Sequence, residues 1–248
     1  MSERTGVLTL RLAGPLQSWG ASSRFTRRAT ERAPTKSGVL GLLAAAQGRE
    51  RDADISDLAA LTFAVRLDQP GTRVRDYQTA QHADTGKSMP VSERFYLSDA
   101  VFVAAVEGDE ALLSSLYAAV RTPVFLPFLG RRSCPPSRPI DLRLHRGASR
   151  GDLLRTLRTE PWQASSTVQR RRVRERRIEL EVIADLVAGD GPGDAIRDQP
   201  LSFDPRHRQY GLRGVRSTAV TVPNPLSTTR AQSFVPPKHD PMELLDDR

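Results

Sequence analysis

Side chains that could perform chemistry are few in this sequence, and they stand far apart. Tyr77 and His82, in the stretch RDYQTAQH, could act as acid and base in metal-free cleavage of RNA. Their spacing fixes no nucleophile between them, so we favour a Tyr77 that stacks or packs and a His82 in a solvated loop. We therefore predict no catalytic residue.

A metal or cofactor site is not indicated either. The four histidines, at positions 82, 145, 207 and 239, are scattered without metal-ligand spacing, and the only cysteine is Cys134. The sequence has no Walker loop and no Gly-x-Ser-x-Gly elbow, and GVLGLL at residues 38–43 is better explained by close helix packing. We predict neither a metal nor a cofactor.

The charge pattern favours a polyanionic partner. The 248 residues include 37 basic and 29 acidic ones, for a net charge of +8, and the stretch from residue 223 onward is slightly acidic. Phosphate neutralisation supplies sequence-independent affinity, and arginine, which far outnumbers lysine here, grips phosphate through two donors. Arg131 and Arg132, in the rigid loop LGRRSC, are candidate RNA contacts. The run QRRRVRERR at 169–177 contacts RNA or an acidic partner, or it forms a solvated face.

The elements that must position these residues follow from hydrophobic periodicity. Strands are predicted at 7–13, 62–68, 94–108 and 138–146. Helices are predicted at 34–48, capped by Thr35 or Ser37 and ended by Gly48, and at 109–123, capped by Asp109. The order strand, helix, strand, strand, helix, strand is the ferredoxin-like arrangement of RNA-recognition domains. We predict an α+β fold in which helices cover one sheet face and the other is left for a partner.

The remaining segments are assigned from composition. Residues 69–93 are polar, turn-rich and basic, and they lie where a hairpin belongs, so we predict a projecting β-hairpin inserted in a domain of residues 1–146. A smaller β-rich part is expected at 147–222, with a short helix at 151–162 and a strand, or alternatively a helix, at 173–186. Residues 223–248 are expected to form an extended or disordered tail.

The compartment is predicted from what the sequence lacks. The N-terminus has no signal-peptide pattern, and the longest apolar stretch, at 38–46, is too short to span a bilayer. A single cysteine excludes an intrachain disulfide. We expect a cytoplasmic protein without a membrane partner.

The first strand ends abruptly in GPLQSWG, at residues 14–20. A rigid, polar and aromatic loop that lies a few residues before Arg24, Arg27 and Arg28 could be the rim of a binding site. It could equally be an ordinary strand end.

Five segments occur in an order and spacing that resemble a known family. They are LRLAGPLQSWG, PTKSGVLGLLAAAQG, RDYQTAQ, YLSDAVFVAAVEG and FLGRRSCPPSRP. Together, over residues 5–145, they resemble the CasD-type subunits of type I-E CRISPR Cascade complexes, which are repeat-associated (RAMP) proteins. The resemblance implies a non-catalytic subunit that binds the five-prime handle of the CRISPR RNA (crRNA) and caps the backbone filament. It also implies contact with the backbone subunit and with the large PAM-reading subunit, and thus with target DNA only indirectly.

Two alternatives stay open. In type I-C relatives the corresponding subunit is itself an endonuclease, which here would be a metal-independent enzyme using Tyr77, His82 or Lys87. The chain could also be a purely structural filament cap whose basic surface merely steers RNA.

The resemblance also suggests RNA contacts. Gln17 and Ser18 would hold handle bases or phosphates, and Trp19 would stack on a base or pack beneath its own loop. Lys36 and Ser37, at a helix N-terminus, would bind phosphate. The hairpin would act as a thumb that clamps the strand. The full set of expected RNA contacts is Gln17, Ser18, Trp19, Arg24, Arg27, Lys36, Ser37, Arg73, Arg75, Tyr77, Gln78, Arg131 and Arg132.

Overall fold

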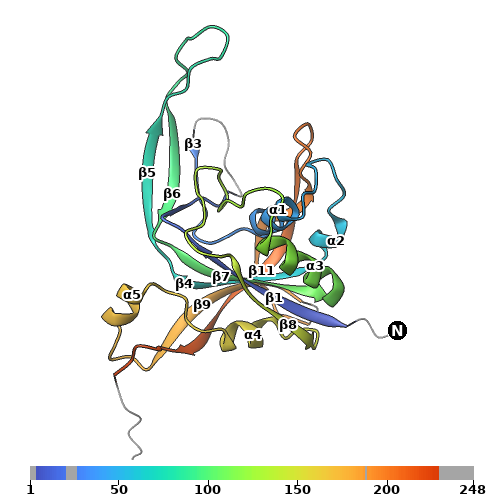
Figure 1. Ribbon diagram of the computed structural model, residues 1–248, viewed down its shortest axis with the longest axis vertical. Helices are drawn as coiled ribbons and strands as arrows, with labels where there is room; N and C mark the ends of the chain where they lie inside the picture. The colour runs from blue at the N-terminus through green and yellow to red at the C-terminus, as the bar shows by residue number, and fades with distance from the viewer. Residues whose placement is uncertain (1–3, 21–26, 188, 229–248) are drawn as a thin grey trace, which may run out of the picture.

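Two β-sheets organise the protein (Figure 1). The structure is a computed structural model that describes residues 4–20, 27–187 and 189–228, with only the backbone described at Arg27. A seven-stranded sheet forms the body of the molecule. A smaller four-stranded sheet lies at one end and carries a long hairpin that projects away from the body.

The central sheet has the strand order β10–β11–β9–β4–β7–β1–β8, and its neighbouring strands are antiparallel. Its strands are β1 (Thr5–Ala13), β4 (Thr62–Gln69), β7 (Val101–Asp109), β8 (Asp141–Ala148), β9 (Arg177–Asp185), β10 (Asp194–Ser202) and β11 (Gln209–Pro223).

Two of the helices connect strands of the central sheet in the N-terminal part of the chain. Helix α1 (Lys36–Ala46) lies between β1 and β4, and α3 (Glu110–Arg121) lies between β7 and β8. Thr35 and Asp109 cap these helices, accepting hydrogen bonds from the amides of Gly38 and Leu112. The predicted order of strands and helices is therefore confirmed for this part.

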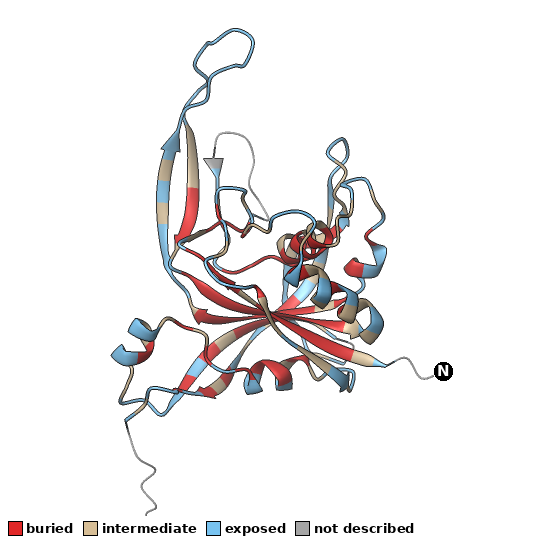
Figure 2. Ribbon diagram, viewed as in Figure 1, coloured by how far each residue is buried: buried red, intermediate tan, exposed pale blue. Residues whose placement is uncertain are grey.

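One face of the sheet is covered by α1, α3 and the short helix α2 (Ser56–Ala59). Leu8, Leu10 and Leu12 of β1 point into this core together with Phe63 and Phe102, and all five are fully buried. Strand alternation explains the pattern, because every second residue of β1 faces the same side. Figure 2 shows the buried residues concentrated in the central strands and in α1.

The second face of the sheet is also covered, which corrects the prediction of an open face. Val7, Val103 and Ala105 face this side and pack against Leu157 of helix α4 (Leu153–Thr159) and against Trp162. The apolar run VFVAAV in β7 already fits this arrangement, because a strand buried on both faces needs apolar residues at successive positions.

A buried arginine fixes α4 to this second face. Arg66 of β4 is fully buried, forms an ion pair with Asp68 at 2.6 Å and donates hydrogen bonds to the carbonyls of Leu157 and Glu160. A buried charge is tolerated only when it is paired and hydrogen-bonded, and Arg66 meets both conditions.

The C-terminal third extends the same sheet. Strand β9 pairs with β4, then β11 with β9, and β10 with β11. The predicted boundary at residue 147 falls within β8, a strand of this one continuous sheet. The segment at 173–186 contains a strand and not the alternative helix. Of the predicted tail, residues 223–228 are described, and Asn224 is buried there.

The projecting hairpin consists of β5 (Thr72–Gln78) and β6 (Ser92–Ser98), which pair from Thr72–Ser98 to Gln78–Ser92. The predicted single strand at 94–108 is wrong. The chain turns at Asp99, which has a φ of 56°, so β6 belongs to the hairpin and β7 to the central sheet. Strand β6 also pairs with the short strands β2 (Leu16–Gln17) and β3 (Arg27–Arg28).

Candidate nucleic-acid interface

The GPLQSWG loop ties the central sheet to the base of the hairpin. The Gln17 side chain is fully buried and donates hydrogen bonds from Nε2 to the carbonyls of Leu12 (3.1 Å) and Ala100 (2.8 Å). Its Oε1 accepts a hydrogen bond from Trp19 Nε1 at 3.0 Å. Ser18 Oγ donates to the Phe95 carbonyl of β6 at 3.1 Å. These residues therefore hold the end of β1 against the start of β7 and against β6.

Trp19 is enclosed by two glycines. A Cβ on Gly38 would lie 2.8 Å from the indole ring, and one on Gly130 would lie 1.8 Å from the Ser18 carbonyl oxygen. Gly130 also has a φ of +83°, which favours glycine. With no exposed surface, the Trp19 ring cannot stack on a base. The structure thus supports packing of Trp19 beneath the loop, and it places Gln17 and Ser18 in the buried scaffold and not on the surface.

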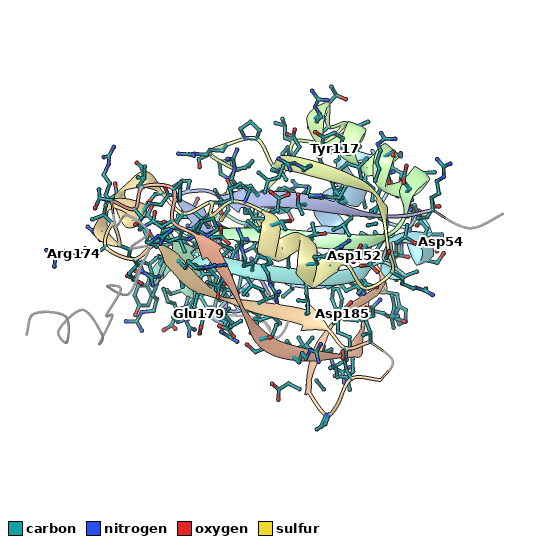
Figure 3. The ribbon with its side chains drawn as sticks, turned by 90° about the horizontal axis from the view of Figure 1, so that it is seen from below. Asp54, Tyr117, Asp152, Arg174, Glu179 and Asp185 are labelled. Atoms are coloured by element: carbon teal, nitrogen blue, oxygen red, sulfur yellow. The ribbon has the colours of Figure 1, made fainter. Side chains whose placement is uncertain are left out.

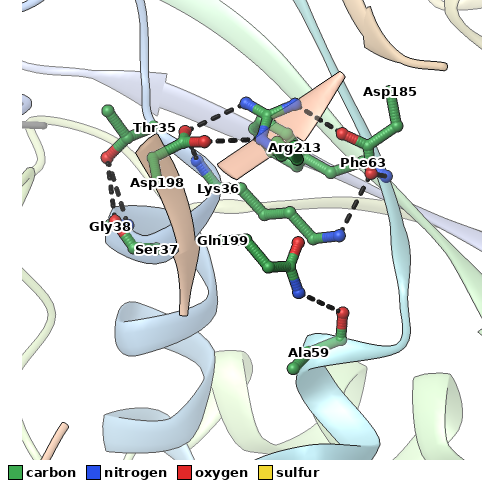
Figure 4. A network of polar contacts seen from close by, with 10 residues as sticks. All are labelled: Thr35, Lys36, Ser37, Gly38, Ala59, Phe63, Asp185, Asp198, Gln199 and Arg213. Atoms are coloured by element: carbon green, nitrogen blue, oxygen red, sulfur yellow. Dashed lines mark hydrogen bonds and ion pairs between the residues drawn. The ribbon is translucent and has the colours of Figure 1, made fainter. Parts of the chain in front are cut away.

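The N-terminus of α1 is occupied by carboxylates from the far end of the chain (Figure 4). The backbone amide of Lys36 donates to Asp198 Oδ2 at 2.8 Å, and its ammonium group pairs with Asp185 at 3.1 Å. Arg213 bridges these two aspartates, with Nε 2.6 Å from Asp198 Oδ1. Burial alone would lower the pKa of Arg213, but its hydrogen bonds and charge contacts with both aspartates raise that pKa overall.

This network corrects the expectation that Lys36 and Ser37 bind phosphate. Asp198 supplies the negative charge that the free amides and positive dipole end of a helix attract, so an internal group fills the position a phosphate would take. Both side chains are buried, and Ser37 contacts the Thr35 hydroxyl.

The outer face of the hairpin presents arginine and tyrosine. Arg73, Arg75 and Tyr77 alternate along β5, so they share one face, and all three are exposed. The Arg73 guanidinium lies 4.4 Å from the ring centroid of Phe95, a β6 residue on the same face of the hairpin. The Arg75 guanidinium lies 4.9 Å from the centroid of the Tyr77 ring. Cation–π contacts of this kind hold the guanidinium groups in place while leaving their donors available.

The inner face of the hairpin presents a second arginine group. Tyr96 is buried on this face, and Arg131 lies over its ring at 4.8 Å from the centroid. Arg131 Nη2 donates to the carbonyl of Arg28 in β3 at 2.8 Å, and its buried Nη1 makes no hydrogen bond within the described residues. Arg94 of β6 lies beside Arg28 in the strand register. An aromatic ring covered by an arginine is therefore found on each face of β6.

Arg28 and Arg94 were not among the predicted RNA contacts. Both join this candidate interface because β3 pairs with β6, a contact between strands more than sixty residues apart that periodicity does not reveal. The alternation of RFYL along β6 was the available signal for Arg94. Among the other expected residues, Gln78 and Arg132 are exposed. Arg24 lies outside the described residues.

The residues of the alternative catalytic hypothesis lie along the hairpin, with Tyr77 in β5 and His82 and Lys87 at the tip. His82 and Lys87 are exposed there, and the His82 amide donates to the Lys87 carbonyl at 2.9 Å. Within the described part of the chain, the side chains of Tyr77, His82 and Lys87 make no hydrogen bond with one another. The described residues also contain no group of three or more His, Cys, Asp or Glu side chains suited to a metal, and no helix among them is long and apolar enough to cross a membrane.

A family model described as CRISPR-associated protein (Cas_Cas5) matches residues 7–216. The chain therefore belongs to the Cas5 family of CRISPR-associated proteins.

Individual relatives agree with this assignment. The Cascade subunit CasD of the CRISPR system of Escherichia coli (strain K12) is 41% identical over 156 residues, which cover 54% of this chain and 69% of that protein. A solved structure described as a crystal structure of a Cas protein is 36% identical, with a TM-score of 0.67 and coverage of 89% of this chain and 99% of that one. A chain from a CRISPR RNA-guided surveillance complex is 31% identical, with a TM-score of 0.69 and coverage of 92% and 95%. The resemblance predicted from the five motifs is confirmed.

Proposed function

We propose that this protein is a non-catalytic, RNA-binding subunit of a type I-E Cascade surveillance complex that acts in antiviral defence in the cytoplasm. It binds the five-prime handle of crRNA and caps one end of the backbone filament. Its protein partners are the backbone subunit and the large PAM-reading subunit, so its relation to target DNA is indirect. In this proposal β8, β1, β7 and β4, with α1 and α3, form a ferredoxin-like unit that carries the β5–β6 hairpin as a thumb.

The observation that carries this proposal is the pair of arginine-covered aromatic rings on β6. Arg73 over Phe95 presents a preoriented guanidinium group on one face of the hairpin, and Arg131, which lies over Tyr96 and donates to the Arg28 carbonyl, fixes the basic segment around β3 on the other face. Guanidinium donors match phosphate geometry, and ordering them in advance reduces the entropy lost on binding. Similarity to a chain of a CRISPR RNA-guided surveillance complex supports RNA over other polyanions.

An exposed apolar segment supports assembly with other proteins. Val124, Phe125 and Leu126 follow α3 and are 66%, 48% and 86% exposed. The amides of Val124 and Phe125 donate to the carbonyls of Ala46 and Ala45, so the segment is tied to the end of α1. A contiguous apolar patch held in a fixed conformation is typical of a protein contact surface.

The first experiment tests RNA contact by the outer hairpin face. We expect Arg73→Gln with Arg75→Gln to reduce the preference for handle RNA over scrambled RNA. The salt dependence of log K for single-stranded RNA should become shallower by about 1.4, which is about 0.7 for each lost phosphate contact. The matched control is Arg206→Gln with Arg208→Gln, two exposed arginines in the β10–β11 turn. If the folded variant keeps the same preference for handle RNA and the same salt dependence, the alternative of a purely structural filament cap is favoured instead.

The second experiment tests the thumb. Residues 79–91 are exposed and follow Gln78, which pairs with Ser92, so a two-residue Asn-Gly turn can replace them. We expect the same melting temperature but weaker retention of crRNA and of the backbone subunit. A deletion from Arg73 onward is unsuitable, because it would uncover Phe95 and Tyr96. A stable variant that assembles normally and keeps its RNA would contradict the clamp.

The endonuclease alternative has its own test. Incubation of repeat RNA with the purified chain in EDTA should leave the RNA intact. Specific cleavage at one site, abolished by Tyr77→Phe or His82→Ala, would replace the non-catalytic proposal.

A further inference from the structure

A second basic surface lies away from the hairpin, on helix α5 (Ser166–Arg171) and the turn that leads into β9. Residues 169–177 contain six arginines and one glutamate. Five of these arginines are exposed, and we name them the α5 arginine cluster. Its members are Arg170, Arg171, Arg174, Arg176 and Arg177.

The backbone under the α5 arginine cluster is held by buried amide side chains. Gln169 Nε2 donates to the carbonyls of Trp162 and Ala164, each at 3.0 Å. Asn224, just after β11, donates from Nδ2 to the carbonyls of Gln169 and Arg172. Its backbone amide also donates to the Arg176 carbonyl at 2.8 Å. The backbone of this charged segment, which could have formed a solvated loop, is thus fixed by contacts with a segment about fifty residues away.

The charge of the cluster is not balanced internally. Glu175 is the only acid within the run, and it forms an ion pair with Arg172, which also lies over the Trp162 ring. Among the residues that the structure describes, no carboxylate pairs with the guanidinium groups of the following four positions. These are Arg170, Arg171, Arg176 and Arg177.

The cluster is anchored to the end of the sheet from which the hairpin projects. The Ser165 amide, at the N-cap of α5, donates to Gln69 Oε1 at 3.0 Å, and the Gln163 amide donates to Asp68. Gln69 ends β4, and the hairpin begins at Thr72. Figure 1 shows α5 and the base of the hairpin at the same end of the sheet, with the hairpin extending upward and α5 lying below the sheet, and Figure 3 shows Arg174 at the opposite end from Asp54.

The chemistry of the cluster fits phosphate better than a protein surface. Protein interfaces usually centre on apolar or aromatic side chains. The stretch 163–177 has no large exposed apolar side chain in the described structure. Several arginines without carboxylate partners favour a chain of phosphates, which can neutralise them one by one.

We propose that the α5 arginine cluster is a second nucleic-acid surface, which binds the phosphodiester backbone of a strand or duplex without reading its sequence. The proposal rests on the proposed function as an RNA-guided complex subunit, but it concerns a surface distinct from the hairpin. Handle preference belongs to the hairpin, and the cluster adds sequence-independent affinity.

The test compares two variants of the full-length chain that lose the same charge. The cluster variant is Arg170→Gln, Arg171→Gln, Arg176→Gln and Arg177→Gln. The control variant is Arg150→Gln, Arg197→Gln, Arg206→Gln and Arg208→Gln, which are exposed positions elsewhere. Fluorescence anisotropy over a salt series measures binding to a random duplex DNA and to a random single-stranded RNA, and melting curves confirm folding.

We expect the slope of log K against log salt to become shallower in the cluster variant than in the control. If all four arginines contact phosphate, the change is about 3.6 for duplex DNA or about 2.8 for single-stranded RNA. Each observed change is divided by this full value for its probe, and the probe with the larger fraction identifies the nucleic acid that the surface takes. The ratio of handle to scrambled RNA binding should stay that of the unmodified chain.

Two results would overturn the proposal. Equal slopes for the cluster and control variants would show that the arginines are only solvated. Loss of a protein subunit from the co-expressed complex, with unchanged slopes, would assign the cluster to an acidic protein instead. Neither result bears on handle binding by the hairpin, because the Arg73 and Arg75 variant tests that binding separately.

Discussion

Gln17 offers the sharpest separation between a structural role and an RNA contact. Its amide makes three buried hydrogen bonds, to Leu12, Ala100 and Trp19, and none of its surface is exposed. The substitution Gln17→Leu keeps a similar volume but removes all three bonds. We therefore expect it to reduce stability and to leave the proposed RNA-binding surface unchanged.

The size of the effect follows from the three partners that lose their hydrogen bonds. A buried group left without its partner costs about 1–3 kcal/mol. With a value near the lower end of this range for each of the three partners, we expect the free energy of unfolding to fall by about 3–5 kcal/mol. For a protein of this size each kcal/mol shifts the melting temperature by about 2–4 °C, so the midpoint should fall by about 6–20 °C.

Circular dichroism melting curves measure the loss, and anisotropy with handle RNA is then recorded at a temperature where the variant is folded. Gln78→Leu is the matched control for the melting curves, because Gln78 is exposed on β5 and, among the described residues, its side-chain amide donates only to Asp76. Its melting temperature should change little. A Gln17→Leu protein with an unchanged midpoint and tenfold weaker handle binding would refute the structural role and restore Gln17 as an RNA contact.

Three further predictions concern the same scaffold. Gly130→Ala should destabilise the protein far more than Gly86→Ala, because both glycines have positive φ but only Gly130 faces a backbone clash; thermal melts compare them, and equal losses would contradict the clash. Burial raises the pKa of the Cys134 thiol, so alkylation near neutral pH should occur only on unfolding, and rapid labelling of the native chain would show an open loop. Lys36→Met should lower the melting temperature and leave the salt dependence of RNA binding unchanged, whereas the exposed control Lys87→Met should leave stability unchanged. A shallower salt dependence for Lys36→Met would restore the phosphate role of Lys36.

Much of the fold could be predicted because its signals are local. Caps at Thr35 and Asp109, and the positive φ of Gly48 after α1, depend on residues within a turn or two of one another. The alternation along β1 and β4 and the apolar run of β7 are likewise properties of short segments. The order of these elements, the presence of an inserted hairpin and the family resemblance were therefore already contained in the sequence.

The boundary between β6 and β7 was harder to predict from the sequence. The run RFYLSDAVFVAAVEG is largely apolar on both sides of Ser98 and Asp99, so two polar residues are the only local sign that one strand ends and another begins. The turn at Asp99 becomes visible only when β6 pairs with β5 and β7 pairs with β1.

The assignment of polar side chains to the interior or to the surface was decided by tertiary structure. Gln17 bonds to Ala100 and the Lys36 amide bonds to Asp198, pairs separated by 83 and 162 positions. A glutamine, a tryptophan or a lysine beside a turn has the same local pattern whether distant segments cover it or leave it open. Sequence by itself determined that an arginine-rich hairpin and a polar loop exist; only the packing of distant strands made the loop a scaffold and left the hairpin arginines free to face a ligand.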